Sequence, residues 1–181
     1  MCRPAWLGGF LGTAYFIGYV CTLLWVPQFA DKYGRKKIFA YGMAVQSVFY
    51  TILMFTQHYY VMLMVTFCFG ALASIRQVTG FIYFLEMMPQ RSNATAGSVF
   101  SIFDGTAYLI VVIYFWVISK DWFYVVLIGY VLQIVGAVLA WTLPEAPPYL
   151  FSVHRYEDAI GVFQKMKNYN KAPYSPVWDQ L

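Results

Sequence analysis

Charged side chains are scarce in this sequence, because Asp, Glu, Lys and Arg together make up only 11% of its 181 residues. A soluble globular domain carries about 25%, so the shortage argues against one. Hydrophobic residues instead account for 61% and aromatic residues for 21%. Several apolar runs approach the ~20 residues that a helix needs to cross hydrocarbon. The composition therefore predicts a membrane protein.

Residue types that catalyse reactions or bind metals are also few. The three cysteines, Cys2, Cys21 and Cys68, have no metal-ligand spacing, and the sequence has only two histidines. No nucleophile, base and orienting group occur together, and no glycine-rich phosphate loop follows a strand. We therefore predict no enzyme activity, no metal site, no cofactor and no nucleic-acid partner.

Five apolar runs, separated by short polar turns, are each long enough to span a membrane as a helix. They cover residues 6–30, 38–57, 59–85, 94–119 and 122–143. Pro144, Pro147 and Pro148 follow the last run and end the membrane region, because proline interrupts the helical hydrogen-bond ladder. We predict an all-α polytopic protein with a membrane bundle over residues 1–150 and an amphipathic surface helix with a tail over residues 151–181.

Small residues recur at four-residue spacing in two of these runs. Gly8 and Gly12 do so in the first run, and Gly97, Ser101 and Gly105 do so in the fourth. Such stripes let helix backbones approach closely in lipid, where no hydrophobic force drives association. We expect close helix crossings within the bundle at both stripes. Dimerisation through Gly8 and Gly12 is the weaker alternative.

Basic residues are divided unevenly between the two ends of the predicted bundle. Nine lie at the end of the first hairpin and the C-terminus, and two lie at the other end. The nine are Lys32, Arg35, Lys36, Lys37, Arg91, Arg155, Lys165, Lys167 and Lys171, and the two are Arg3 and Lys120. Because basic residues mark the cytoplasmic side, we expect hairpin 31–37, the surface helix and the C-terminus to be cytoplasmic. The N-terminus is expected on the opposite side.

A charged hairpin joins the first two runs, and residues 31–37 read D-K-Y-G-R-K-K. This stretch resembles the loop between the second and third helices of Major Facilitator Superfamily transporters, whose pattern is G-x-x-x-D-[RK]-x-G-R-[RK]-[RK]. The charged half matches, whereas Pro27 stands where the family has its first glycine.

Three further stretches resemble the same family, in the same order. Arg76 and Gly80, in R-Q-V-T-G, resemble the R-x-x-x-G of the fourth helix. Residues 83–91 resemble the signature that follows this helix in sugar porters and organic cation transporters. Residues 144–150, P-E-A-P-P-Y-L, resemble the P-E-S-P-R-[WY]-L after the sixth helix. The continuation around Arg155 is similar to the organic cation and carnitine transporter branch.

The resemblance covers helices two to six of the family's N-terminal half, while helix one and the second six-helix half lie outside the match. In the family, the substrate cavity lies between the two halves near the membrane midplane. The resemblance therefore implies three kinds of partner: membrane lipid, a small organic solute, and a second half or partner subunit.

The resemblance also implies roles for the charges at the cytoplasmic end. The hairpin would be a latch that pairs with the other half during alternating access, and further charges would form a network beside the surface helix. The gating residues implied in this way are Asp31, Gly34, Arg35, Lys36, Lys37, Glu86, Arg91, Glu145 and Arg155. The alternative for the hairpin is a topology anchor that fixes orientation through positive charge.

Arg76 and Asp104 are the ionisable residues in the interior of the predicted spans. A charge that faces lipid is costly, so we expect both to face protein or water. Gly80 lies one turn from Arg76 on the same helix face. The functional interpretation is that Arg76 binds an anionic substrate group or belongs to a proton-linked network. The alternative is a structural pair with Asp104 or with backbone carbonyls. The family resemblance supports a pathway role for Arg76 only, and a cation-binding role for Asp104 has no motif behind it.

Two functions from different classes remain open. One is transmembrane transport of a small organic solute by alternating access, as a partial or fragment Major Facilitator transporter. The other is a non-transporting structural or assembly subunit of a membrane complex, derived from such a transporter. Arg76 and the hairpin charges favour transport, whereas Pro27 and Pro148 at motif positions favour the structural subunit.

Overall fold

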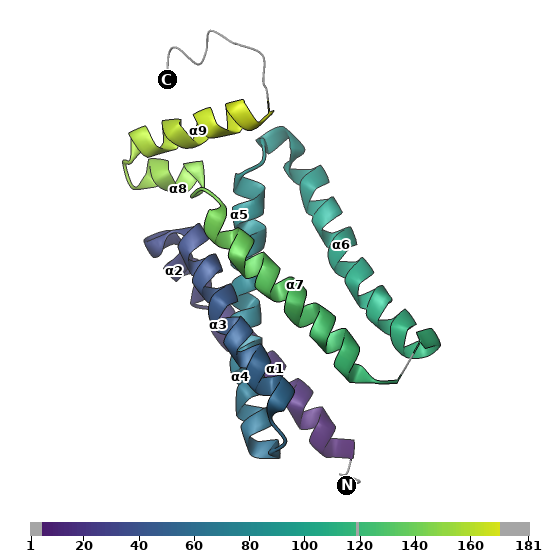
Figure 1. Cartoon of the computed structure of the whole chain (residues 1–181). Coiled ribbons are helices and arrows are strands. Elements are labelled where there is room, and N and C mark those ends of the chain that lie inside the picture. The colour runs from purple at the N-terminus through teal and green to yellow at the C-terminus, as the bar shows by residue number, and fades with distance from the viewer. Residues whose placement is uncertain (1–4, 119, 171–181) are drawn as a thin grey trace.

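The computed structural model describes residues 5–118 and 120–170, and the regular secondary structure of these residues is helical (Figure 1). The α-helices are α1 (Ala5–Leu23), α2 (Val26–Tyr33), α3 (Arg35–Phe55), α4 (Tyr59–Ser74), α5 (Gly80–Glu86), α6 (Asn93–Ile113), α7 (Trp122–Thr142), α8 (Pro147–Ser152) and α9 (Tyr156–Asn170). The described residues also include two π-helical segments, η1 (Ile75–Thr79) and η3 (Tyr114–Ile118), and one 3-10 turn, η2 (Gln90–Ser92).

Five helical stretches are long and apolar enough to cross a membrane, as the sequence predicts. They are Trp6–Leu23, Arg35–Phe55, Tyr59–Glu86, Asn93–Ile118 and Trp122–Thr142. The third stretch joins α4, η1 and α5, and the fourth joins α6 and η3. The chain is therefore an all-α polytopic bundle, which confirms the predicted fold class.

The first predicted run, residues 6–30, is two helices rather than one. α1 ends at Leu23, and α2 begins at Val26 with Pro27 in its first turn. In a continuous helix, the proline ring would collide with the carbonyl of Leu23, four residues earlier. In the first turn of a new helix, the missing N–H has no partner to lose. Pro147 likewise lies at the start of a helix, α8, after the last span has ended at Thr142.

The closest helix crossing joins α1 to α4 through glycines other than the expected pair. A Cβ added to Gly18 or to Gly70 would lie 2.1 Å from a backbone oxygen of the other helix. Gly8 and Gly12, by contrast, meet nothing within 4 Å, so the crossing expected there within the bundle is wrong. Near the N-terminal end of α1, the Tyr59 hydroxyl donates a 3.0 Å hydrogen bond to the backbone carbonyl of Leu7. A long side chain, rather than backbone contact, therefore joins the two helices there.

α3 and α7 are joined by a buried apolar cluster and by a polar ladder. The cluster consists of Ala40, Met43, Ala137 and Ala140. The polar ladder lies closer to the C-terminal end of α3. In it, the Thr51 hydroxyl donates to the Tyr130 oxygen at 2.8 Å, and the Gln133 amide donates to the Gln46 oxygen at 3.3 Å. Interhelical hydrogen bonds in membranes contribute about 0.6 kcal/mol on average and up to about 1.7 kcal/mol. These bonds fix the register of α3 against α7.

α6 stands apart from the other spans (Figure 1), and none of its described residues is buried. It reaches α5 through the ring of Phe100, which contacts Phe81 and Phe84. A Cβ at Gly97 would lie 3.7 Å from Phe81, an ordinary contact distance, and one at Gly105 would meet nothing within 4 Å. The close crossing expected at this small-residue stripe is therefore absent.

α8 and α9 lie across the hairpin end of the bundle, far from the first turn of α1 (Figure 1). They pack together through Leu150, Ala159 and Val162. Acidic residues occupy the first turn of α9 and Lys167 the last, an arrangement that matches the helix dipole. The predicted surface helix is thus α9, and the predicted tail, residues 171–181, lies outside the described residues.

Candidate functional site

The hairpin between α2 and α3 turns at Gly34, whose φ is +100°. This conformation suits glycine, because a side chain would be strained there. A Cβ at this position would also lie 2.8 Å from Glu145 Oε2 and 3.1 Å from the ring of Tyr149. Backbone conformation and the space available therefore both require glycine at the corner.

Glu145 lies in the connection between α7 and α8 and caps the first turn of α3. Its Oε1 accepts a 2.9 Å hydrogen bond from the backbone N–H of Lys36. The first N–H groups of a helix have no partner within the helix, and the helix dipole favours a negative charge beside them. The Tyr149 hydroxyl donates at 3.4 Å to the Lys32 carbonyl at the end of α2. These contacts fasten the segment after the last span to both helices of the hairpin.

Arg35 joins the hairpin to the end of α5. Its guanidinium pairs with Asp31 at 3.0 Å and forms a second ion pair with Glu86. The Arg35 and Glu86 side chains are 22% and 18% exposed, whereas Asp31 is 64% exposed. Partly buried charges are screened less than exposed ones, so Glu86 is the stronger partner of Arg35. The other oxygen of Glu86 is buried without a hydrogen-bond partner, which carries a desolvation cost.

Tyr83 brings a third contact to this end of the bundle. It is buried in α5, and its hydroxyl donates a 2.6 Å hydrogen bond to the Pro144 carbonyl. Its ring stacks on Phe39 of α3, with the ring centroids 6.5 Å apart. We refer to the connected set as the hairpin junction, and it comprises Asp31, Gly34, Arg35, Lys36, Tyr83, Glu86 and Glu145.

Arg76 lies in η1, a π-helical turn inside the third span. Single π turns within α-helices occur frequently at functional sites. Arg76 and Asp104 both lie in the neighbourhood of Tyr15 of α1, so the three side chains share one region of the bundle. Among the described residues, neither Arg76 nor Asp104 has an ion-pair or hydrogen-bond partner. The residues that the structure describes therefore do not include the structural pair that was the alternative for Arg76.

Asp104 also lines a pocket of about 310 Å³ between η1, α5 and α6, where Gln77 and Ser101 add further polar groups. Gly80 has a different position, because a Cβ there would lie 2.7 Å from the ring of Phe39. Gly80 therefore allows α5 to approach α3 and does not line this pocket. Within the described ranges, no three His, Cys, Asp or Glu side chains converge on a metal site.

Comparison with known proteins assigns the family. A profile described as Major Facilitator Superfamily matches residues 7–177. The chain belongs to the Major Facilitator Superfamily. The family that the four motifs resemble is thereby confirmed.

Three relatives show which branch of the superfamily the chain is similar to. Solute carrier family 22 member 16 from Homo sapiens is 24% identical over 172 residues, which are 95% of this chain and 30% of the relative. Solute carrier family 22 member 4 from Mus musculus is 24% identical over 94% of this chain and 31% of the relative. Organic cation/carnitine transporter 2 from Homo sapiens is 22% identical over 94% of this chain and 30% of the relative. The similarity to the organic cation branch is confirmed, and the chain spans about 30% of the length of these relatives.

Three of the gating residues implied by the superfamily resemblance lie outside the hairpin junction. Arg155 pairs with Asp158, three residues later in α9, at 2.6 Å. Arg91 is exposed in η2, and Lys37 is exposed on α3. Neither of the latter two has an ion-pair partner among the described residues. Among the described residues, Arg155, Arg91 and Lys37 therefore form no ion pair with the hairpin junction.

Sequence reasoning missed two tyrosines of these sites. Tyr149 occupies the [WY] position of the superfamily pattern after the sixth helix, so the motif contained a signal for it. Tyr15 had none, because the sequence holds 16 tyrosines and this one lies in a run without charges or motif residues. Only the packing of α1 against α4 brings it near Arg76.

Proposed function

We propose that the chain takes part in transmembrane transport of a small organic solute by alternating access, as part of the N-terminal half of a Major Facilitator transporter. The proposal depends on Arg76 and Asp104, two charges near Tyr15 within the spans that have no ion-pair partner among the described residues. Ionisable groups inside membrane spans mark substrate and ion pathways. Charges that served packing alone would be neutralised by each other or by nearby carbonyls.

The solute that fits these charges is an organic cation or a zwitterion such as carnitine. The planar guanidinium of Arg76 is suited to hold a carboxylate through two hydrogen bonds. The carboxylate of Asp104 would attract the ammonium group at the other end of the molecule. The names of Organic cation/carnitine transporter 2 and of the Drosophila melanogaster Organic cation transporter-like protein support this solute class.

The hairpin junction would serve as the gate at one end of the pathway. It connects α2, α3, α5 and the α7–α8 segment through a few charged contacts. Contacts of this kind are worth about 0–3 kcal/mol each, so they are able to break and re-form between states. The unpartnered oxygen of Glu86 would gain a donor in the state in which the junction rearranges.

A second half or partner subunit would complete the pathway, because superfamily cavities lie between two halves. Two observations support such a partner. α6 has no buried residues among those described, and an apolar pocket of about 670 Å³ opens between the end of α5 and α8–α9. The lysine and arginine distribution supports a cytoplasmic location for the hairpin end and the C-terminus, with the N-terminus on the opposite side.

The test is uptake of labelled tetraethylammonium, carnitine and glucose into proteoliposomes. The chain is reconstituted alone, and also together with the missing helices of human Organic cation/carnitine transporter 2 supplied as a second chain. We expect uptake of carnitine and of the cation in the combined sample, loss of carnitine uptake with Arg76→Ala and a reduced rate for both solutes with Asp31→Asn. Lys120→Ala, which removes an exposed charge at the other end of the bundle, is the matched control and should transport normally.

One outcome would favour the structural subunit instead. It is the absence of flux in every combination, together with co-purification of the chain in fixed stoichiometry with a larger membrane complex. Equal flux in the wild-type chain and in Arg76→Ala would leave transport standing and would contradict the role of Arg76.

A further inference from the structure

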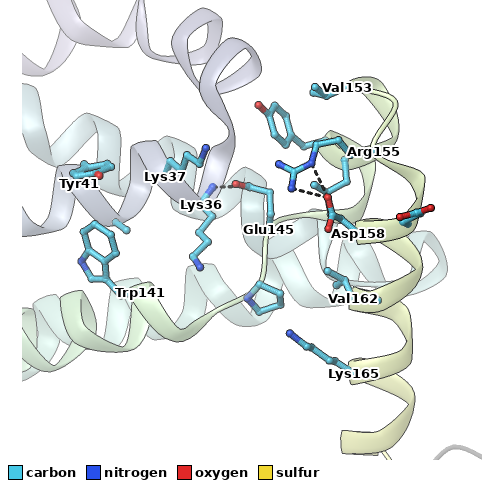
Figure 2. A pocket seen from close by; sticks show the side chains of 16 residues that line it. Lys36, Lys37, Tyr41, Trp141, Glu145, Val153, Arg155, Asp158, Val162 and Lys165 are labelled. Atoms are coloured by element: carbon cyan, nitrogen blue, oxygen red, sulfur yellow. Dashed lines mark hydrogen bonds and ion pairs between the residues drawn. The ribbon is translucent and has the colours of Figure 1, made fainter.

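A second pocket, separate from the Arg76 region, opens at the hairpin end between α3, α7 and α9 (Figure 2). Its volume is about 530 Å³. Four basic residues line it: Lys36, Lys37, Arg155 and Lys165. Figure 2 shows the side chain of Lys36 leaving α3 and that of Lys165 leaving α9, both toward the space beside the end of α7. Positive charge thus comes to one pocket from helices far apart in the sequence.

Three carboxylates also line the pocket, so its four basic and three acidic side chains leave a formal net charge of +1. Glu145 is engaged by the Lys36 backbone N–H, and Asp158 is engaged by Arg155. Glu157 is the remaining carboxylate of the lining. The amino groups of the three lysines have no hydrogen-bond or ion-pair partner among the described residues. Three lysine ammonium groups in one pocket are therefore available to bind an anion.

An aromatic pair shows where this pocket lies relative to the lipid. Tyr41 and Trp141 line it, with their rings edge to face and the centroids 5.0 Å apart. The two residues are 58% and 48% exposed and lie near the hairpin ends of their spans. Tyr and Trp favour the membrane–water interface, where one part of the ring is apolar and the other is wet. One wall of the pocket thus belongs to the interface, and the other is the surface helix α9.

We propose that this pocket binds the phosphate-bearing headgroup of an anionic membrane lipid, of the phosphoinositide class. Lys36, Lys37 and Lys165 would hold the phosphates, while Tyr41 and Trp141 would contact the glycerol and the start of the acyl chains. Basic pockets on the cytoplasmic side of transmembrane helices recognise such headgroups. A bound lipid would hold α9 against α3 and α7. This inference rests on the proposed cytoplasmic location of the hairpin end but not on transport, since it concerns a surface on the outside of the bundle.

The test is native mass spectrometry of the detergent-solubilised full chain, titrated with short-chain phosphatidylinositol bisphosphate. Each lysine near an anionic lipid surface contributes about fivefold in affinity. We therefore expect Lys36→Gln combined with Lys165→Gln to weaken binding about 25-fold, and the corresponding pair of Arg substitutions to preserve it. Lys36→Gln alone should weaken binding about fivefold, and Lys32→Gln is its matched control: it removes one charge at the same end of the bundle but outside the pocket, and it should change affinity less than twofold.

Three results would overturn the proposal. The first is an equal loss in Lys32→Gln, which would show attraction by the whole surface. The second is equal binding of phosphatidylcholine, which would show no selectivity for added phosphate. The third is binding of soluble inositol trisphosphate as tight as that of the lipid, which would assign the pocket to a free phosphate compound. Circular dichroism and melting temperature establish that each variant is folded.

Discussion

Gly34 lies directly against the carboxylate of Glu145, since a Cβ at this glycine would be 2.8 Å from Glu145 Oε2. The same carboxylate accepts the backbone N–H of Lys36 at 2.9 Å. The corner of the hairpin and the N-terminal cap of α3 therefore depend on one side chain from the other end of the sequence. This arrangement couples the first hairpin of the bundle to the segment that follows its last span.

Gly34→Ala should destabilise the chain by about 1–3 kcal/mol, the cost of a non-glycine residue in a sparsely populated backbone conformation, with the contact to Glu145 adding to it. Thermal unfolding in detergent measures the effect. Gly161→Ala in α9 is the control, because a Cβ there meets nothing within 4 Å. That substitution should stabilise by about 0.5–1 kcal/mol. Equal melting temperatures for the two variants would contradict the geometry of the hairpin.

Gly70→Ala should weaken the packing of α1 against α4, because the new Cβ would lie 2.1 Å from the backbone oxygen of Tyr15. Overpacking of this kind costs about 1–3 kcal/mol. Gly12→Ala changes an open position of α1 and should be neutral or stabilising. Melting temperatures of the two variants provide the comparison. A larger loss at Gly12 would indicate that the crossing lies at the N-terminal stripe after all.

The Arg35–Glu86 pair should show energetic coupling in a double-mutant cycle. With both side chains about four-fifths shielded from solvent, we expect a coupling of about 1–3 kcal/mol between Arg35→Gln and Glu86→Gln. Asp31 is largely exposed, so Asp31→Asn should be coupled to Arg35→Gln by less than about 1 kcal/mol. Free energies of unfolding from denaturant titration give both values. Coupling through Asp31 as strong as through Glu86 would contradict this ranking.

The orientation of the bundle leads to a labelling prediction. Single cysteines are placed at Gln57 and at Arg91, in a chain whose native cysteines are replaced by alanine. A membrane-impermeant maleimide applied from the cytoplasmic side should label Arg91→Cys and leave Gln57→Cys unlabelled. Both positions are exposed, so accessibility alone does not separate them. The opposite pattern would reverse the topology.

The five spans were predictable from sequence because each is a long apolar run bounded by polar residues, and run length alone decides whether a helix crosses hydrocarbon. The break after Leu23 was also present in the sequence, since Pro27 excludes a continuous helix there. It was missed because the whole run, residues 6–30, is apolar enough to read as one span. Hydropathy therefore located the membrane segments but not the helix boundaries inside them.

Contacts between helices were harder to predict. Gly8 and Gly12 have the spacing of a helix crossing, yet the crossing uses Gly18 and Gly70, which belong to different helices and form no pattern within either. Arg155 likewise lies in a stretch that resembles the family, but it pairs with Asp158, three residues later in the chain. A motif fixes the type of residue at a position, whereas its partner is set by how two distant helices meet. The proximity of Tyr15 to Arg76 and Asp104 is of the same kind.

The most direct test of transport through this bundle is uptake of carnitine and of tetraethylammonium by Arg76→Gln, with the chain reconstituted beside the remaining helices of a relative. Because Arg76 is proposed to hold a carboxylate, its loss should lower carnitine uptake at least tenfold, which corresponds to about 1.4 kcal/mol. Tetraethylammonium has no carboxylate, so its uptake should stay within about threefold of wild type. Equal loss of both solutes, or no uptake of either by the wild-type chain, would contradict a substrate-binding role for Arg76.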